Sequence, residues 1–196
     1  MTKNVILQLT FILLSLASCK PSSTNKPTLD DYKIGEKWTW KWESTTNGKV
    51  GGTGEDIRQI VDYNGTLGLW NGSDTLKMAD ILNKKKSDTP YRSWPLKVGK
   101  KWKYESKWTN ESGEKGITSQ DAEVISFEEL NLPAGKFMAY KIKYVGYIQN
   151  YQVGGKGKVT DTFWYSPKLK QNIKHIQEGG GGFRYTSELI NYTGAK

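Results

Sequence analysis

Few residues in this chain combine the types and the spacing that catalysis requires. His175 is the single histidine and Cys19 the single cysteine among 196 residues. A Ser-His-Asp hydrolase would depend on His175, but no Gly-x-Ser-x-Gly segment accompanies it. A zinc site would lack histidine and cysteine partners. We therefore interpret His175 as an ordinary strand residue, and we predict no catalytic residues, no cofactor and no metal site.

Two pairs of adjacent acidic residues, Asp30-Asp31 and Glu128-Glu129, are candidates for acid–base chemistry. Neighbouring residues of a strand point to opposite faces, so neither pair is expected to form a carboxylate dyad. A glycosidase pair assembled from distant positions stays open. The glycines at 179–182 lack the Lys-Ser/Thr of a phosphate-binding loop, and we predict a hairpin loop there. The sequence thus favours a protein that is not an enzyme.

The eight tryptophans are the main indication of a binding function. Exposed tryptophan faces can stack on sugars, and a concave aromatic face can hold acyl chains. Core packing is the alternative, because Trp38, Trp40 and Trp42 alternate with Lys37 and Lys41. The sequence does not decide between these roles.

The N-terminal segment has the layout of an export signal. Lys3 precedes an apolar stretch, Val5 to Leu16, of about 12 residues, whereas a membrane-spanning helix needs roughly 20. That length is typical of a signal-peptide core. The stretch runs into Leu16-Ala17-Ser18-Cys19, which resembles the lipobox of bacterial lipoproteins. The alternative is a buried cysteine in an amphipathic N-terminal helix.

The lipobox resemblance implies a membrane anchor. Residues 1–18 would be removed, Cys19 would carry a diacylglycerol, and acylation, for example by palmitate, could follow on the new amine. Lys20 stands where an aspartate would favour the inner membrane, so the resemblance implies an outer membrane protein that faces the periplasm. Because the only cysteine is used by the anchor, no intramolecular disulfide is available. We expect a monomer.

The net charge of +9 favours negatively charged partners. A basic exported protein can meet anionic lipids, polyanionic glycans or acidic proteins, and a solvated lysine-rich surface is the alternative. The predicted export argues against nucleic acid.

Behind the anchor we predict a polar tether, residues 19–29, and one β-rich domain, residues 30–196. Apolar and aromatic residues alternate with lysines over 37–43, 101–108 and 140–144, the pattern of antiparallel strands with one wet face. Turn pairs separate these strands, and the principal ones are Asn47-Gly48, Gly51-Gly52, Asn64-Gly65, Pro133-Ala134 and Gly154-Gly155. We predict an all-β fold, an antiparallel curved sheet in the form of a half-barrel or sandwich. At most one short helix is expected, near Met78, Ile81 and Leu82.

An internal repeat links two parts of the domain. Residues 33–40, Lys-Ile-Gly-Glu-Lys-Trp-Thr-Trp, match residues 97–104, Lys-Val-Gly-Lys-Lys-Trp-Lys-Tyr. The match could reflect two similar halves of one curved sheet. It could equally reflect two turns that lead into a strand and therefore require the same residue types. The sequence leaves both explanations open.

The C-terminal half resembles a family of exported bacterial proteins of unknown function. The matching segments are Pro95 to Tyr104, Glu129 to Phe137, Ala139 to Ile142 and Phe163 to Pro167, while the family's glycine after the last segment is missing. The resemblance implies a curved sheet similar to the half-barrel of lipoprotein carriers, and it carries no catalytic residues. Asp74-Thr75-Leu76 also fits a short O-glycosylation pattern of exported proteins in one bacterial phylum.

These observations lead to one functional expectation. We expect a membrane-anchored lipoprotein that binds or carries a hydrophobic ligand or a lipoprotein at the cell envelope. The alternative is a glycan-binding module that uses exposed tryptophans. The two differ in what the fold must provide: an apolar cavity of several hundred Å³ for the first, and exposed, coplanar tryptophans for the second.

Overall fold

The domain is built on one antiparallel sheet. The computed structural model describes residues 25–83, 87 and 89–195, and ten strands pair there in the order β4-β3-β2-β1-β10-β9-β8-β7-β6-β5. The strands are β1 Lys37–Thr46, β2 Lys49–Tyr63, β3 Thr66–Trp70, β4 Thr75–Lys77, β5 Lys101–Thr109, β6 Lys115–Leu132, β7 Gly135–Asn150, β8 Lys156–Ser166, β9 Gln171–Gly179 and β10 Phe183–Thr193. Three short helical segments accompany them: η1 Leu29–Asp31, α1 Met78–Asn83 and η2 Gly180–Gly182.

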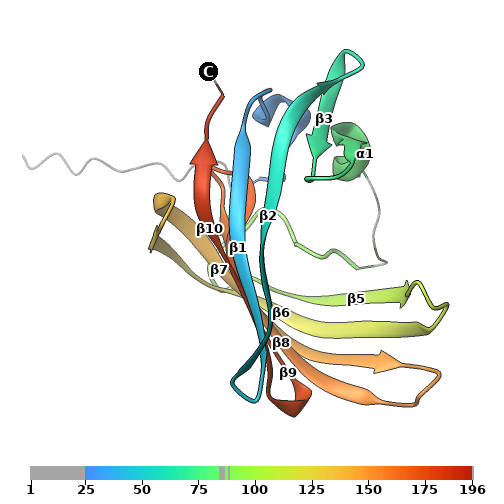
Figure 1. Ribbon diagram of the computed structural model, residues 1–196. Coiled ribbons are helices and arrows are strands. Elements are labelled where there is room, and N and C mark those ends of the chain that lie inside the picture. The colour runs from blue at the N-terminus through green and yellow to red at the C-terminus, as the bar shows by residue number, and fades with distance from the viewer. Residues whose placement is uncertain (1–24, 84–86, 88, 196) are drawn as a thin grey trace, which may run out of the picture.

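The sheet consists of two meanders joined side by side. Strands β1–β4 form one and strands β5–β10 the other, and the pairing of β1 with β10 connects them. The sheet curves so strongly that β1, β2 and β10 cross the direction of β5–β8 (Figure 1). The edge strands β4 and β5 do not pair with each other, so the sheet stays unclosed. The predicted all-β, curved antiparallel sheet with one short helix is confirmed.

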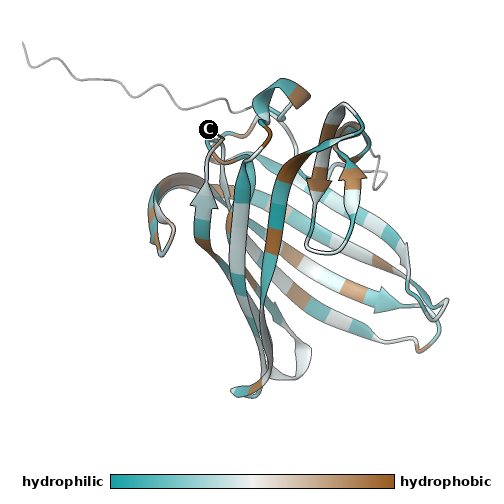
Figure 2. Ribbon diagram, turned by 45° about the horizontal axis from the view of Figure 1, so that its top comes forward, coloured by the Kyte–Doolittle hydropathy of each residue, from teal (hydrophilic) through white to brown (hydrophobic). Residues whose placement is uncertain are grey.

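The alternation of residue types along the strands places aromatic residues such as Trp40 and Phe163 on one face of the sheet. Hydrophobic and hydrophilic residues follow each other along the ribbons (Figure 2). The register aligns Trp40 of β1 with Leu189 of β10, and His175 of β9 with Phe163 of β8. We call the face that carries these side chains the inner face.

A connection crosses the inner face of the second meander. In it the Tyr91 ring stacks on Tyr144 of β7 at 5.4 Å and meets Phe163 of β8 at 5.9 Å, edge to face. Leu96, at the end of the same connection, is fully buried. We call residues 89–96 the strap.

Two hydrophobic clusters result from this arrangement. One lies under the strap and includes Leu96, Val124, Ile142 and Tyr144. The other surrounds Trp38 and Ile60 on the first meander, where Tyr32 and Met78 join it. The helix predicted near Met78 is present as α1 and contributes to this second cluster.

Most predicted turns are confirmed, and one is wrong. Asn47-Gly48 and Asn64-Gly65 have positive φ at both residues, as tight hairpin turns with the twist of the strands require. Gly51-Gly52 instead lies inside β2. The Trp42 side chain of β1 packs across these glycines, and a Cβ at Gly54, two residues further along β2, would stand only 2.8 Å from its ring.

The internal repeat corresponds to a shared hydrogen-bond pattern. In the first copy, Glu36 N donates to Lys33 O at 3.2 Å, Gly35 N donates to Ile60 O at 2.8 Å, and Ile60 N donates to Glu36 O at 2.8 Å. This pattern closes the turn and ties it to β2.

The second copy repeats these bonds at equivalent residues. Lys100 N donates to Lys97 O at 3.0 Å, Gly99 N donates to Val124 O at 2.8 Å, and Val124 N donates to Lys100 O at 2.9 Å. The repeat therefore corresponds to one turn geometry that opens both β1 and β5.

Candidate functional site

The single histidine lies in a polar network rather than alone on a strand. His175 Nε2 is 2.8 Å from Asp161 Oδ1, and its ring stacks on Phe163 with the ring centroids 4.0 Å apart. Asp161 also accepts hydrogen bonds from Gln177 and Gln120, each at 2.8 Å. The network spans four strands, β6, β8, β9 and the neighbouring β10 through the Tyr185 ring, and it holds the imidazole in one orientation.

Sequence reasoning missed Asp161 as the partner of His175, and Gln120 and Gln177 as the partners of Asp161. Their separations along the chain, up to 41 residues between Gln120 and Asp161, give no local signal. Only the register of β6 to β9 shows that their side chains share the inner face.

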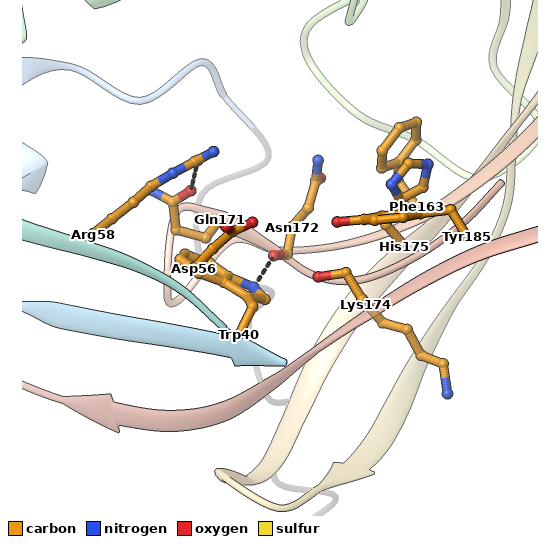
Figure 3. A pocket seen from close by; sticks show the side chains of 10 residues that line it. Trp40, Asp56, Arg58, Phe163, Gln171, Asn172, Lys174, His175 and Tyr185 are labelled. Carbon is orange, nitrogen blue, oxygen red and sulfur yellow. Dashed lines mark hydrogen bonds between the residues drawn. The ribbon is translucent and has the colours of Figure 1, made fainter. Parts of the chain in front are cut away.

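His175 lines a small pocket in the inner face, which we call the polar pocket (Figure 3). Its volume is about 200 Å³. Trp40 forms part of its wall, held by a hydrogen bond from its Nε1 to Asn172 O at 2.9 Å. The residues that line it are Trp40, Asp56, Arg58, Phe163, Gln171, Asn172, Lys174, His175, Tyr185 and Ser187. Amides, a carboxylate, a guanidinium and aromatic rings thus face one space.

A serine of the polar pocket stands opposite the histidine on the neighbouring strand. Ser187 of β10 pairs with His175 of β9. Within the described residues no hydrogen bond joins their side chains. Burial raises the pKa of the Tyr185 phenol, and the neighbouring Ser187 hydroxyl lowers it by a smaller amount. The hydroxyl is therefore not positioned by His175 as a nucleophile would be.

A larger cavity lies beside the strap, and we call it the aromatic cavity. Its volume is about 480 Å³. Apolar and aromatic side chains make up most of its wall, namely Pro27, Tyr32, Ile81, Leu82, Pro90, Tyr91, Trp94 and Tyr165. Lys26, Arg92 and Lys170 bring positive charge to the same wall.

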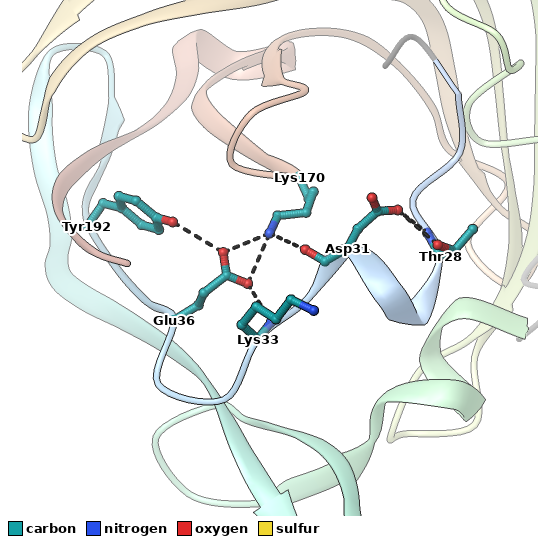
Figure 4. A network of polar contacts seen from close by, with 6 residues as sticks. All are labelled: Thr28, Asp31, Lys33, Glu36, Lys170 and Tyr192. Carbon is teal, nitrogen blue, oxygen red and sulfur yellow. Dashed lines mark hydrogen bonds and ion pairs between the residues drawn. The ribbon is translucent and has the colours of Figure 1, made fainter. Parts of the chain in front are cut away.

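One of these cations is neutralised within the fold. Lys170 Nζ lies 2.7 Å from Glu36 Oε1 and 3.0 Å from Oε2 (Figure 4). The Tyr192 hydroxyl donates to the same carboxylate at 3.2 Å. Both partners of the ion pair are largely buried, so their attraction is weakly screened by water.

The tyrosines of the aromatic cavity stay uncharged at neutral pH. Burial raises the pKa of Tyr165 to about 12, and it raises the pKa of Tyr32 and Tyr91 as well. Their hydroxyl groups therefore supply no counter-charge to the cations.

The tryptophans divide into core and half-buried residues. Trp38, Trp40 and Trp164 are buried, and the other five are only partly exposed. Trp42 stacks on Tyr185 with 6.2 Å between ring centroids, the arrangement nearest to a platform. Core packing thus accounts for part of the tryptophan content, and the fully exposed surface required by the glycan hypothesis is not provided.

The two acidic pairs do not form catalytic dyads. Asp31 Oδ2 accepts hydrogen bonds from Thr28, and Glu128 accepts from Trp164 Nε1 at 2.8 Å. Hydrogen bonds from Ser126 and Trp164 lower the pKa of the Glu128 carboxyl. Glu129 instead lies 3.8 Å from Lys136.

The predicted anchor lies outside the described residues, which begin at 25, so lipid attachment at Cys19 stays a prediction. Among the helices of the described ranges, none is long and apolar enough to cross a bilayer.

No family model matches the sequence, and no curated protein matches it. Solved structures of similar shape include a protein described as exported, with a YmcC-like fold, from Bacteroides fragilis. It is 13% identical with a TM-score of 0.39, over 87% of this chain and 99% of that one.

A lipoprotein from Parabacteroides distasonis is 13% identical with a TM-score of 0.46, over 89% of this chain and 100% of that one. The hypothetical lipoprotein YmcC from Escherichia coli is 11% identical with a TM-score of 0.40, over 81% and 85%. No functional residue is carried over from these proteins to this chain.

Proposed function

We propose that this domain binds a hydrophobic ligand in the aromatic cavity and acts as a binding or carrying protein at the cell envelope rather than as an enzyme. The observation that carries the proposal is the cavity itself. Its volume of about 480 Å³ lies within the range of roughly 300–1,000 Å³ that is usual for small-molecule sites. An acyl chain or another lipid-like group is the class of ligand that such walls accommodate.

The walls of the cavity favour an apolar group energetically. Ile81, Leu82 and Trp94 are only partly buried in the free protein, so a ligand would remove apolar surface from water. Each methylene group transferred from water contributes about 0.8 kcal/mol. A chain of several methylene groups therefore provides enough free energy for specific binding.

The location follows from the predicted anchor. Lipidation at Cys19 would hold the domain within a tether's length of a membrane, where lipids and other lipoproteins are present. Lys26 and Pro27, the first residues of the tether that line the cavity, place the cavity close to that anchor along the chain.

The uncharged fluorescent probe N-phenyl-1-naphthylamine tests the proposal. The full chain carries Cys19→Ala, so that no attached lipid competes. We expect saturable binding, and we expect Leu82→Trp, which fills the cavity, to weaken it at least about tenfold, the loss of some 1.4 kcal/mol. Val153→Trp is the matched control, because Val153 is exposed on a distant hairpin. Absence of saturable binding, or unchanged binding by Leu82→Trp, would overturn the proposal.

A second candidate function is glycan binding in the polar pocket. It is favoured by the side chains of Asp56, Gln171 and Asn172, which present hydrogen-bonding groups beside the rings of Trp40 and Tyr185. Amides and carboxylates beside aromatic faces suit a hydroxylated ring.

Calorimetric titration with polysaccharide from the envelope of the source cells tests this second candidate. We expect Asp56→Ala to abolish any heat of binding. Glu55→Ala is the matched control, since Glu55 neighbours Asp56 on β2 but points to the opposite face. Equal heats for the two variants, or none for the unsubstituted chain, would remove the glycan hypothesis.

A further inference from the structure

Arg92 is a cation in the wall of the aromatic cavity that has no counter-ion among the described residues. Its guanidinium carbon lies 4.3 Å from the ring centroid of Tyr165 and 5.6 Å from that of Trp94. Nη2 donates to Asn172 Oδ1 at 2.7 Å, whereas Nε is buried and has no hydrogen-bond partner. Within residues 25–83, 87 and 89–195, no carboxylate forms an ion pair with Arg92.

This arrangement is costly without a ligand. A buried donor that loses its bond to water and gains no partner costs about 1–3 kcal/mol, and more in a charged group. Aromatic rings offset part of this cost through cation–π attraction. They leave the buried Nε–H unsatisfied and the charge unpaired.

The neighbouring Lys170 shows what a satisfied cation looks like in this cavity. Its ammonium group is held by both oxygens of Glu36. Arg92 faces no equivalent carboxylate within the described ranges, and the surrounding tyrosines are uncharged at neutral pH. The difference marks Arg92 as a position in the described wall where no carboxylate balances the positive charge, whereas Lys26, the third cation, donates to Leu82 O at 2.7 Å.

We infer that the ligand of the aromatic cavity is an amphiphile whose head group is an oxyanion, carboxylate or phosphate, paired with Arg92. This inference rests on the function proposed above and adds the class of head group to it. A guanidinium binds either oxyanion through charge-assisted N–H donors, and in Arg92 the Nη groups would supply them because Nε is buried. The apolar chain would lie against Ile81, Leu82 and Trp94.

The alternative is that Arg92 only clamps the strap to the sheet. The hydrogen bond to Asn172 and the contact with Tyr165 would then be its whole role. A clamp affects stability but confers no preference for a charged head group, so the two roles are separable.

The experiment compares amphiphiles that share a twelve-carbon chain and differ in the head group. Burial of each carbon of the chain contributes about 0.8 kcal/mol, so the shared chain contributes equally to each ligand. Dodecanoate, dodecyl phosphate and dodecanol displace N-phenyl-1-naphthylamine from the full chain carrying Cys19→Ala at pH 8. We expect at least one oxyanion to bind about 10-fold to 100-fold more tightly than dodecanol, as a hydrogen bond to a charged group would provide. The tighter of the two oxyanions identifies the head group.

Arg92→Gln should abolish this preference while dodecanol still binds as in the unsubstituted chain. Arg184→Gln is the matched control, because Arg184 is exposed and paired with Glu178 outside both cavities. Thermal unfolding confirms that each variant is folded, and the preference of the unsubstituted chain is informative even if Arg92→Gln does not fold.

The failures of the two proposals are distinguishable. If none of the amphiphiles binds, the proposed function fails, and this inference fails with it. If dodecanol binds as tightly as both oxyanions, or Arg92→Gln keeps the preference, only the inference about Arg92 is overturned.

Discussion

The turn before β1 and the turn before β5 share one backbone but differ in the role of their last residue. At Glu36 the side chain is 5% exposed and pairs with Lys170 across the domain. At the equivalent position Lys100 is only partly buried, and its ammonium group donates to Pro95 O at 3.0 Å within the same loop. The Glu36 side chain thus joins distant parts of the chain, whereas the Lys100 side chain bonds within its own loop.

Their positions in the sheet explain the difference. Strand β1 lies between β2 and β10, and the loop that carries Lys170 reaches the Glu36 side chain. Strand β5 is an edge strand, with a neighbouring strand on one side only. The same local sequence thus builds the same turn, while the neighbours decide which side-chain chemistry the turn supports.

Replacing the tryptophan that follows each turn, Trp38 or Trp102, should give the largest difference in stability between the two regions. Trp38→Ala should cost about 3–5 kcal/mol, as expected for a fully buried ring, whereas Trp102→Ala should cost clearly less because Trp102 is half-buried. Urea denaturation of both variants measures the difference. Equal losses of stability would show that the difference in burial between Trp38 and Trp102 does not affect the free energy of unfolding.

Breaking the ion pair should reveal the next largest difference. Lys170→Met leaves the buried Glu36 carboxylate without its cation and should cost about 3 kcal/mol. Lys100 is partly buried and occupies the position in the second turn that Glu36 occupies in the first. Lys100→Met should change stability by less than about 0.5 kcal/mol. A cost below about 1 kcal/mol for Lys170→Met in the same denaturation assay would contradict the importance of the ion pair.

The two glycines should behave alike and so confirm what the turns share. Gly35 has φ +93° and Gly99 has φ +82°, and at neither glycine does a neighbouring atom come closer than 4.0 Å to where a Cβ would stand. Alanine at either position should therefore cost only the backbone penalty of positive φ, about 1–2 kcal/mol. Thermal unfolding of the two variants checks this, and costs that differ by more than about 1 kcal/mol would show that the turns are not equivalent.

An alkaline titration should give the smallest effect, and one specific to the first turn. Burial and the nearby Glu36 carboxylate raise the pKa of Tyr192 to about 12. A raised pKa contributes stability fully below about pH 10, the ordinary tyrosine range, and the contribution is lost as pH rises towards 12. Tyr192→Phe should reduce the loss of stability between these two pH values, measured by denaturation at each pH. An unchanged pH dependence would mean that the Tyr192 hydroxyl does not titrate with folding.

The candidate site was less predictable from sequence than the strands were. Alternation over residues 37–43 and 140–144 predicted the strands and their buried faces, because period two is a local property of the backbone. His175 was interpreted as an ordinary strand residue, since its partner Asp161 stands on another strand and their contact depends on register. The aromatic cavity combines Tyr32, Ile81 and Tyr165 from distant segments, so no single window of sequence contains it.

The amino-acid sequence by itself determined the residues that alternate, the glycines that permit the turns, and the repeat that opens β1 and β5. It also predicted the lipid anchor at Cys19. Only the tertiary structure decided that Glu36 would meet Lys170, that His175 would meet Asp161, and that Arg92 would line an apolar cavity with no carboxylate paired to it among the described residues. The physical reason is that turns and strand faces depend on neighbouring residues, whereas ion pairs and cavities depend on the curvature of the sheet and on the order of its strands.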